Sequence, residues 1–136
     1  AILCAQLERR AEILRKRFQV FEWYRQELQE LTPLGFQATI SDRTISPWLF
    51  PVIVKAGSVA RHRVMRQLSE NQIETRPFFI PVHTMPPYRK FARGRDFQLP
   101  ITDRLGEQGM SLPTFTDLTH EQVVLISGLI RDALDD

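Results

Sequence analysis

Apolar residues near the start of the chain recur with the spacing of a long amphipathic helix. Leucine or phenylalanine stands at every seventh position from Leu7 to Leu28, and charged side chains fill the opposite face. Pro33 and Gly35 end this pattern. We therefore predict one helix over residues 1–31, roughly 46 Å long at about 1.5 Å per residue. No capping residue precedes it, so we expect the chain to begin inside or just before a helix of a longer protein.

The remaining sequence alternates short apolar runs with amphipathic helices. Pro51 lies within the first apolar run and favours an edge strand or a bulge there. Strands separated by helices could form a parallel sheet, but short strands with long connections equally permit a mixed or antiparallel one. We predict an α/β (α+β) fold with a small mixed or antiparallel sheet of about three strands and helices packed mainly on one face. The strands are predicted over 48–55, 73–80 and 110–115, and the helices over 58–70, 102–108 and 119–134.

Local signals predict where these helices begin and end. Ser58 is expected to cap the helix that follows it, and Asn71 is expected to end that helix in the left-handed conformation. Thr102 is expected to cap the short helix. Thr119 and Gln122 form the capping-box pattern at the start of the last helix.

Composition indicates a globular protein of one domain. The chain has 136 residues, of which 43% are hydrophobic and 25% are charged. Its single cysteine, Cys4, excludes an internal disulfide framework, and its apolar neighbours predict a buried thiol. No apolar run approaches the roughly 18 residues of a membrane span, and no signal peptide is visible, so we expect a cytoplasmic protein.

The formal net charge of +2 conceals an uneven distribution. Residues 56–95 contain eight basic and two acidic side chains, whereas residues 96–136 contain two basic and eight acidic ones. A basic middle attracts phosphate, so a free-standing module that binds nucleic acid or a phosphorylated partner is one hypothesis. The alternative is that the two regions neutralise each other within one domain.

Residues 76–89, RPFFIPVHTMPPYR, form the strongest candidate for a ligand-facing segment. Four prolines fix φ near −65° and lack a backbone donor, so this segment cannot be an ordinary helix or a central strand. A rigid, irregular path that carries His, Tyr and Arg is typical of loops that present polar groups to a ligand. The alternative is a proline-rich connection with a buried aromatic plug. His83 could donate to a substrate oxygen or relay a proton.

Common catalytic and metal-binding motifs are absent from the sequence. It contains no GxGxxG, GxxxxGK[ST] or GxSxG motif and no Cys/His cluster with metal-ligand spacing. None of its three lysines lies in an obvious catalytic setting. The residues by themselves therefore predict an α/β domain with a ligand-facing segment and no metal site.

Three stretches of the chain resemble motifs of one enzyme family. RPFFIPVHTMPPYR resembles the RPxxxPLHxxPxY segment of the DegT/DnrJ/StrS family of nucleotide-sugar aminotransferases, which depend on pyridoxal phosphate (PLP). Residues 1–28 resemble that family's helix with AxxxAQLER, and residues 99–123 resemble its closing LPxxxRL and SLP pattern. The resemblance implies that residues 1–136 are the C-terminal, small domain of a larger aminotransferase, with residues 1–31 as the helix that connects to the large domain.

The resemblance also implies a reaction and its partners. Such enzymes are cytoplasmic homodimers that move an amino group, usually from glutamate, to a nucleotide-linked keto sugar during polysaccharide or lipopolysaccharide biosynthesis, with PLP as electron sink. Their Schiff-base lysine lies in the large domain. We therefore expect this chain to hold no catalytic, cofactor-binding or metal-binding residue, to bind no PLP, nucleic acid or membrane, and to be inactive alone.

Four positions of this chain match substrate-facing positions of the family. His83 occupies the histidine of the PLH motif, where the small domain approaches the sugar nucleotide. Arg76 and Tyr88 occupy flanking motif positions, and Phe115 after SLP is a further candidate. Arg76 and Tyr88 could instead brace the segment. Val82 replaces the common leucine, which is a conservative apolar change.

Overall fold

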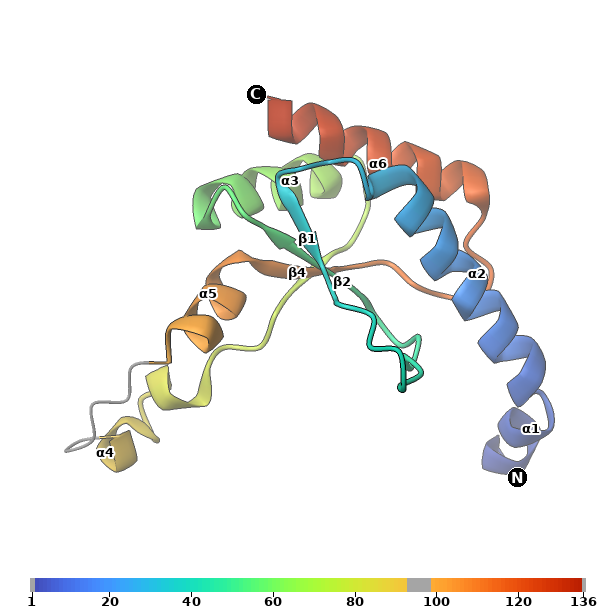
Figure 1. Cartoon of the computed structure of the whole chain (residues 1–136), viewed down its shortest axis with the longest axis horizontal. Coiled ribbons are helices and arrows are strands. Elements are labelled where there is room, and N and C mark those ends of the chain that lie inside the picture. Colours follow the sequence, from blue (N-terminus) through green and yellow to red (C-terminus); the bar gives the residue numbers. More distant parts are fainter. Residues whose placement is uncertain (1, 93–98, 136) are drawn as a thin grey trace.

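The N-terminal region forms two helices rather than one. The structure, a computed structural model, describes residues 2–92 and 99–135. Helix α1 spans Ile2–Glu8 and helix α2 spans Arg10–Leu28, with a turn at Arg9 where the chain changes direction (Figure 1). The prediction of one helix over 1–31 is therefore wrong. No residue of α1 is buried, so no packing within this chain holds α1 in line with α2.

All buried residues of α2 lie in its C-terminal half. Val20, Tyr24 and Leu28 are buried at helical spacing, whereas Leu7 of α1 is 53% exposed. Cys4 is also exposed, which contradicts the predicted buried thiol. A seven-residue repeat identifies a helix, but burial follows only where a second layer lies over the apolar face.

A four-stranded antiparallel sheet forms the centre of the described fold, in the order β1-β2-β4-β3. The predicted small sheet is confirmed in its antiparallel form, with one strand more than expected. A strand forms within the predicted range 73–80, but its predicted bounds were too long, because only Arg76 and Pro77 belong to it. The strands are β1 (Leu34–Phe36), β2 (Phe50–Val54), β3 (Arg76–Pro77) and β4 (Gly109–Leu112).

Pro51 lies in an inner strand, although the sequence predicted an edge strand or a bulge. β2 has β1 on one side and β4 on the other. The pairing with β1 ends at Val52, opposite Phe36, while Pro51 itself faces Ser111 of β4. Pro51 therefore has a strand neighbour on one side only, which is the local equivalent of an edge position.

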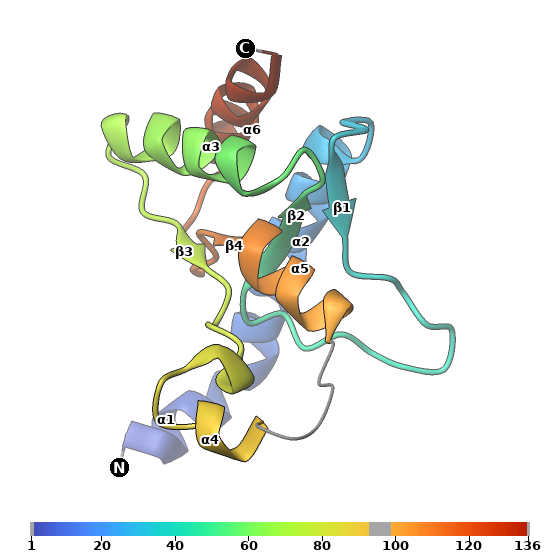
Figure 2. The same ribbon diagram turned by 90° about the vertical axis from the view of Figure 1, so that its left-hand side faces the viewer.

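Helices cover mainly one face of the sheet, as predicted. Helices α3 (Ser58–Glu70) and α6 (His120–Asp135) lie on that face together with α2 (Figure 1). Alternate residues of β2 are buried beneath them. Helix α5 (Pro100–Gln108) packs on β2 and β4 from the other side, as Figure 2 shows. None of the helices in the described residues combines the length and apolar character needed to cross a membrane.

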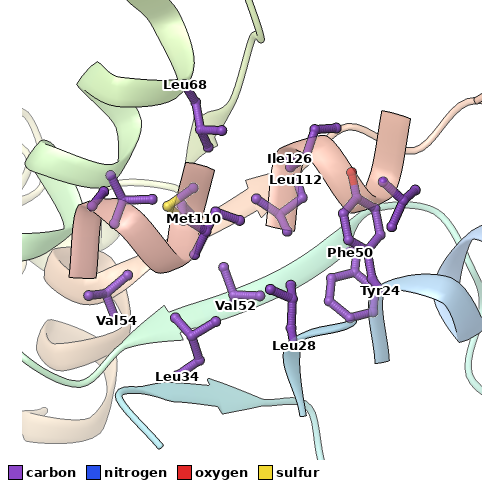
Figure 3. Packing of buried hydrophobic residues seen from close by; sticks show 14 of the residues in the cluster. Tyr24, Leu28, Leu34, Phe50, Val52, Val54, Leu68, Met110, Leu112 and Ile126 are labelled. Atoms are coloured by element: carbon purple, nitrogen blue, oxygen red, sulfur yellow. The ribbon is translucent and has the colours of Figure 1, made fainter. Parts of the chain in front are cut away.

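The core fills the space between this helical layer and the sheet. The side chains of Tyr24, Leu28, Val52 and Met110 are at most 1% exposed. Figure 3 shows the tyrosine ring beside Phe50 at one end of this cluster. Because its members come from helices and strands far apart in sequence, the cluster joins the N-terminal and C-terminal regions into one packed unit.

Three predicted helix caps are wrong, although the helix bounds are close. Gly57, with φ of 103°, precedes α3, and Ser58 is the first helical residue without a side-chain cap. Asn71 has φ of −95°, and the next residue, Gln72, adopts the left-handed conformation with φ of 61°. Helix α5 begins two residues before Thr102. Glycine tolerates positive φ without steric cost, so Gly57 suits the turn into α3.

The predicted capping box at the start of α6 is confirmed. The Thr119 N–H donates to Gln122 Oε1 at 3.0 Å, and the Gln122 N–H donates to Thr119 Oγ1 at 3.3 Å. We expect Thr119→Ala to lower the free energy of unfolding by about 1 kcal/mol, because one backbone donor loses its partner. Urea titration measures this, with Thr44→Ala in an exposed loop as the control. Equal midpoints for the two variants would contradict the expectation.

Candidate functional site

The proline-rich segment follows an irregular path along one end of the molecule. It leaves the sheet through β3, forms the 3₁₀ turn η1 (Val82–Thr84) and reaches the short helix α4 (Arg89–Ala92), as Figure 2 shows. The carbonyl of Pro81 accepts hydrogen bonds from the Thr84 N–H at 3.0 Å and from Thr84 Oγ1 at 2.8 Å. The predicted irregular, constrained path is confirmed.

Two glycines let this segment approach α5 closely. A Cβ built on Gly106 would lie 2.8 Å from Cδ of Pro81, and one built on Gly109 would overlap the ring of Phe78. The Phe78 N–H also donates to the Gly109 carbonyl at 3.1 Å. The alternative of a buried aromatic plug does not hold, because Phe78 is only partly buried and Phe79 is 87% exposed.

His83 has a carboxylate partner that sequence reasoning missed. Its Nε2 lies 2.9 Å from Oδ1 of Asp103, in the first turn of α5. The imidazole is mostly covered, with 21% of its side-chain surface exposed. Asp103 is distant in the sequence and matches no motif, so only the packing of α5 against the segment reveals the pair.

Arg76 and Phe115 line an open cavity of about 490 Å³ at the β3 edge of the sheet. Its walls are the chain entering β3, the loop after β4 and the start of α6, and Leu112, Leu118 and Ile126 contribute apolar side chains. Arg76 lies 3.3 Å from the carboxylate of Glu74, and both side chains are exposed. The cavity has the size of a small-molecule site, with an apolar lining and a few polar groups.

The four candidate residues therefore fall into two groups. Arg76 and Phe115 share the cavity, whereas His83 and Tyr88 lie farther along the segment and do not line it. The Tyr88 side chain is 48% exposed, and its backbone N–H donates to the Met85 carbonyl at 3.0 Å. The structure thus places three of the candidates on the proline-rich segment and Phe115 on the loop after β4, but it does not bring the four side chains into one pocket.

None of the three lysines lines the cavity, although Lys90 lies two residues after Tyr88. Lys16 contacts Asp117 at 3.3 Å on the surface of α2, and Lys55 donates to a backbone carbonyl at 3.0 Å. Lys90 lies over the ring of Phe91. No lysine lines the described cavity, so these residues offer no amine where a Schiff base could face a bound ligand. Among the described residues, no group of three or more His, Cys, Asp or Glu side chains could hold a metal ion.

Two arginines of the basic middle bind carbonyls of the C-terminal region. Arg61 is 8% exposed, and its Nη1 donates to the carbonyls of Gly106 and Gly109 at 3.3 and 3.4 Å. Arg63 Nε donates to the Ala133 carbonyl near the end of α6 at 2.6 Å. Cations favour the negative end of a helix, so these side chains stabilise the fold.

Comparisons with known proteins point to one family. A sequence model described as the DegT/DnrJ/EryC1/StrS aminotransferase family matches residues 1–131. GDP-perosamine synthase of Vibrio cholerae is 35% identical over 133 residues, which are 97% of this chain and 35% of that protein. GDP-perosamine synthase of Caulobacter vibrioides is 36% identical over 129 residues, which are 90% of this chain and 33% of that protein.

A solved structure shows the same arrangement of helices and strands. The aminotransferase TlmJ from Streptoalloteichus hindustanus superposes with a TM-score of 0.84 at 25% identity. The superposition covers 97% of this chain and 34% of TlmJ. The chain therefore spans about a third of the length of the proteins that it matches.

Proposed function

The chain belongs to the DegT/DnrJ/EryC1/StrS aminotransferase family, and on that premise we propose that it forms the C-terminal, small domain of a sugar aminotransferase. The complete enzyme uses PLP to transfer an amino group from glutamate to a keto sugar attached to a nucleotide. We further propose that it acts as a cytoplasmic homodimer in polysaccharide or lipopolysaccharide biosynthesis, with helices α1 and α2 connecting to the large domain.

The match of the family model over residues 1–131 carries this proposal. Two relatives named GDP-perosamine synthase align with nearly the whole chain, which supports a nucleotide-linked sugar as the substrate. The alternative of a free-standing nucleic-acid module is not favoured, because the comparisons find aminotransferases. Arg61 and Arg63, which contributed to the basic middle, are engaged in hydrogen bonds within the fold.

The residues of this chain do not fit the cofactor by themselves. Lys55 and Lys90 are exposed, Lys16 is partly buried, and all three are engaged elsewhere, so none is placed to hold PLP. We propose that the Schiff-base lysine belongs to another part of the complete enzyme and that the isolated chain is inactive. We therefore assign no chemical step to the residues of this chain.

The proposed contribution of this domain is to bind the substrate. His83, fixed on its proline-rich turn, faces the sugar nucleotide and offers one ring nitrogen to it. Arg76, at the mouth of the cavity, supplies a cation for phosphate, and Phe115 supplies an apolar surface beside it. Tyr88 contributes a phenol farther along the same segment. Support for these roles comes from the family motif positions and, for Arg76, Tyr88 and Phe115, from the exposure of the side chains.

Lysine replacement tests the proposal directly. We expect the 136-residue chain, mixed with PLP, glutamate and a nucleotide-linked keto sugar, to show no transamination by coupled assay. We expect the complete gene product to be active, and to remain active with its cofactor bound when Lys16, Lys55 and Lys90 are all replaced by arginine. Transamination by the isolated chain, or loss of bound PLP in the triple variant, would contradict the proposal.

A further inference from the structure

His83 is carried by backbone that has little freedom relative to α5. The hydrogen bonds from Thr84 to the Pro81 carbonyl close the turn around His83. Arg89 Nε donates to the Thr84 carbonyl at 2.9 Å and holds the far side of the turn. The contact between Pro81 and Gly106 then fixes this turn on α5, while the prolines restrict φ. The position of the imidazole relative to α5 is thus set by the fold.

Asp103 supplies an acceptor at the point where the imidazole meets α5. Its backbone N–H donates to the Leu99 carbonyl at 2.9 Å, and the positive end of the helix dipole favours a carboxylate in this first turn. Asp103 Oδ1 lies 2.9 Å from His83 Nε2, and the two side chains are 41% and 21% exposed. The contact is therefore better shielded from water than a fully exposed ion pair.

The partner of Nε2 determines the chemistry of the other ring nitrogen. A carboxylate oxygen is negatively charged and carries only lone pairs, so its approach to 2.9 Å from Nε2 is favourable only when Nε2 carries a proton. In the neutral imidazole, Nδ1 then carries the lone pair. Among the hydrogen bonds formed by the described residues, none involves Nδ1 of His83.

His62 shows the opposite arrangement in the same chain. Arg61 donates to Nε2 of His62 at 3.0 Å, so this nitrogen must carry the lone pair. Nδ1 of His62 lies 2.6 Å from the Ser58 carbonyl and therefore carries the proton. The two histidines thus provide an internal comparison for any measurement of tautomers.

We propose that Asp103 is a positioning residue of the substrate site. It holds the ring of His83 with Nε2 protonated and leaves Nδ1 as the acceptor for a hydroxyl or N–H group of the nucleotide sugar. Asp103 acts through His83 and is not placed in contact with the substrate. The identity of the ligand rests on the function proposed above, whereas the pairing of the two side chains does not.

Nitrogen NMR of the imidazole rings tests the pairing. A long-range ¹H–¹⁵N correlation of the labelled chain is recorded near pH 8.5, about two units above the ordinary histidine pKa. We expect unprotonated Nδ1 in His83 and unprotonated Nε2 in His62. Asp103→Ala is expected to convert His83 to a mixture of tautomers and to leave His62 unchanged. A protonated Nδ1 in the unmodified chain, or no change in Asp103→Ala, would overturn the proposal.

A matched variant separates positioning from a general effect on α5. Glu107 is an exposed carboxylate of the same helix and forms no ion pair or side-chain hydrogen bond with a described residue. Glu107→Ala is expected to leave the His83 tautomer unchanged. If Asp103→Ala does not fold, Asp103→Leu replaces it, because leucine has nearly the same size and can neither accept nor donate a hydrogen bond. An Nε2–H population as high in Asp103→Leu as in the unmodified chain would also overturn the proposal.

Kinetics of the complete enzyme test the role toward the ligand. Asp103→Leu is expected to raise KM for the nucleotide sugar about five- to tenfold, the scale of one hydrogen bond, with kcat changed less than about twofold. An unchanged KM would overturn the role in positioning, whatever the tautomer. Absence of transamination in the unmodified enzyme would instead contradict the proposed function and would leave the NMR result intact.

Discussion

Replacing Tyr24 by alanine is expected to lower the free energy of unfolding by about 4 kcal/mol. The side chain is fully buried, its ring lies 4.9 Å from that of Phe50 between centroids, and its hydroxyl donates to the Pro113 carbonyl at 3.1 Å. The substitution removes the ring from the core and leaves a partly buried carbonyl without its partner. Urea unfolding followed by far-UV circular dichroism measures the change.

Two companion variants separate the contributions. Tyr24→Phe keeps the ring and removes the hydroxyl, so it is expected to lose only about 1 kcal/mol. Leu14→Ala lies on the same helix at a position that is 44% exposed, and it is expected to change stability by less than about 0.5 kcal/mol. A loss in Leu14→Ala as large as in Tyr24→Ala would contradict the conclusion that the buried side chains of α2 lie in its C-terminal half.

Tyr24 also couples stability to pH. Burial raises the pKa of the Tyr24 phenol well above its ordinary value of 10.0. The folded state therefore retains the proton at pH values where the unfolded chain releases it, and stability falls as pH rises above about 10. Tyr24→Phe is expected to show a smaller loss over this range, as measured by urea titrations between pH 9 and pH 11. Equal pH dependence in both proteins would contradict this coupling.

Replacing Gly109 by alanine is expected to lower the free energy of unfolding by about 3 kcal/mol. A Cβ at this position would overlap the Phe78 ring and lie 2.5 Å from the Leu105 carbonyl oxygen. The carbonyl belongs to the backbone of α5 and cannot rotate away as a flexible side chain would. The Phe78 ring belongs to the proline-rich segment, so relief of its overlap with the new Cβ requires the segment to move away from α5. We therefore also expect the contact between His83 and Asp103 to weaken.

Gly128 provides a matched control with the opposite sign. It lies within α6, and a Cβ there would meet no atom within 4 Å outside its immediate neighbours. Gly128→Ala is expected to raise the free energy of unfolding by about 0.5–1 kcal/mol, because alanine loses less backbone entropy in a helix. Thermal unfolding compares both variants with the unmodified chain. Similar losses of stability in Gly109→Ala and Gly128→Ala would contradict the conclusion that Gly109 is needed for the close approach of Phe78 and α5.

Some features that depend on near neighbours in sequence were predictable, although three helix caps predicted from local sequence were wrong. The reciprocal bonds of Thr119 and Gln122 join residues within one helical turn, so the capping-box pattern was sufficient to place the start of α6. The four prolines of the segment restrict their own φ angles, so its irregular path followed from composition. The family motifs likewise identified the family, which the comparisons confirm for residues 1–131.

Features that depend on distant neighbours were decided only by the tertiary structure. The seven-residue repeat of leucine and phenylalanine identified the N-terminal helices. The position of α6 and of the sheet, however, determines that Val20 is buried and Leu7 is exposed. The tolerance of Pro51 in an inner strand depends on where β1 stops pairing. His83 was recognisable as a candidate, whereas its partner Asp103 was not, because the packing of α5 on the segment brings them together. Sequence patterns report local backbone energetics, and contacts between distant segments depend on how complete elements pack.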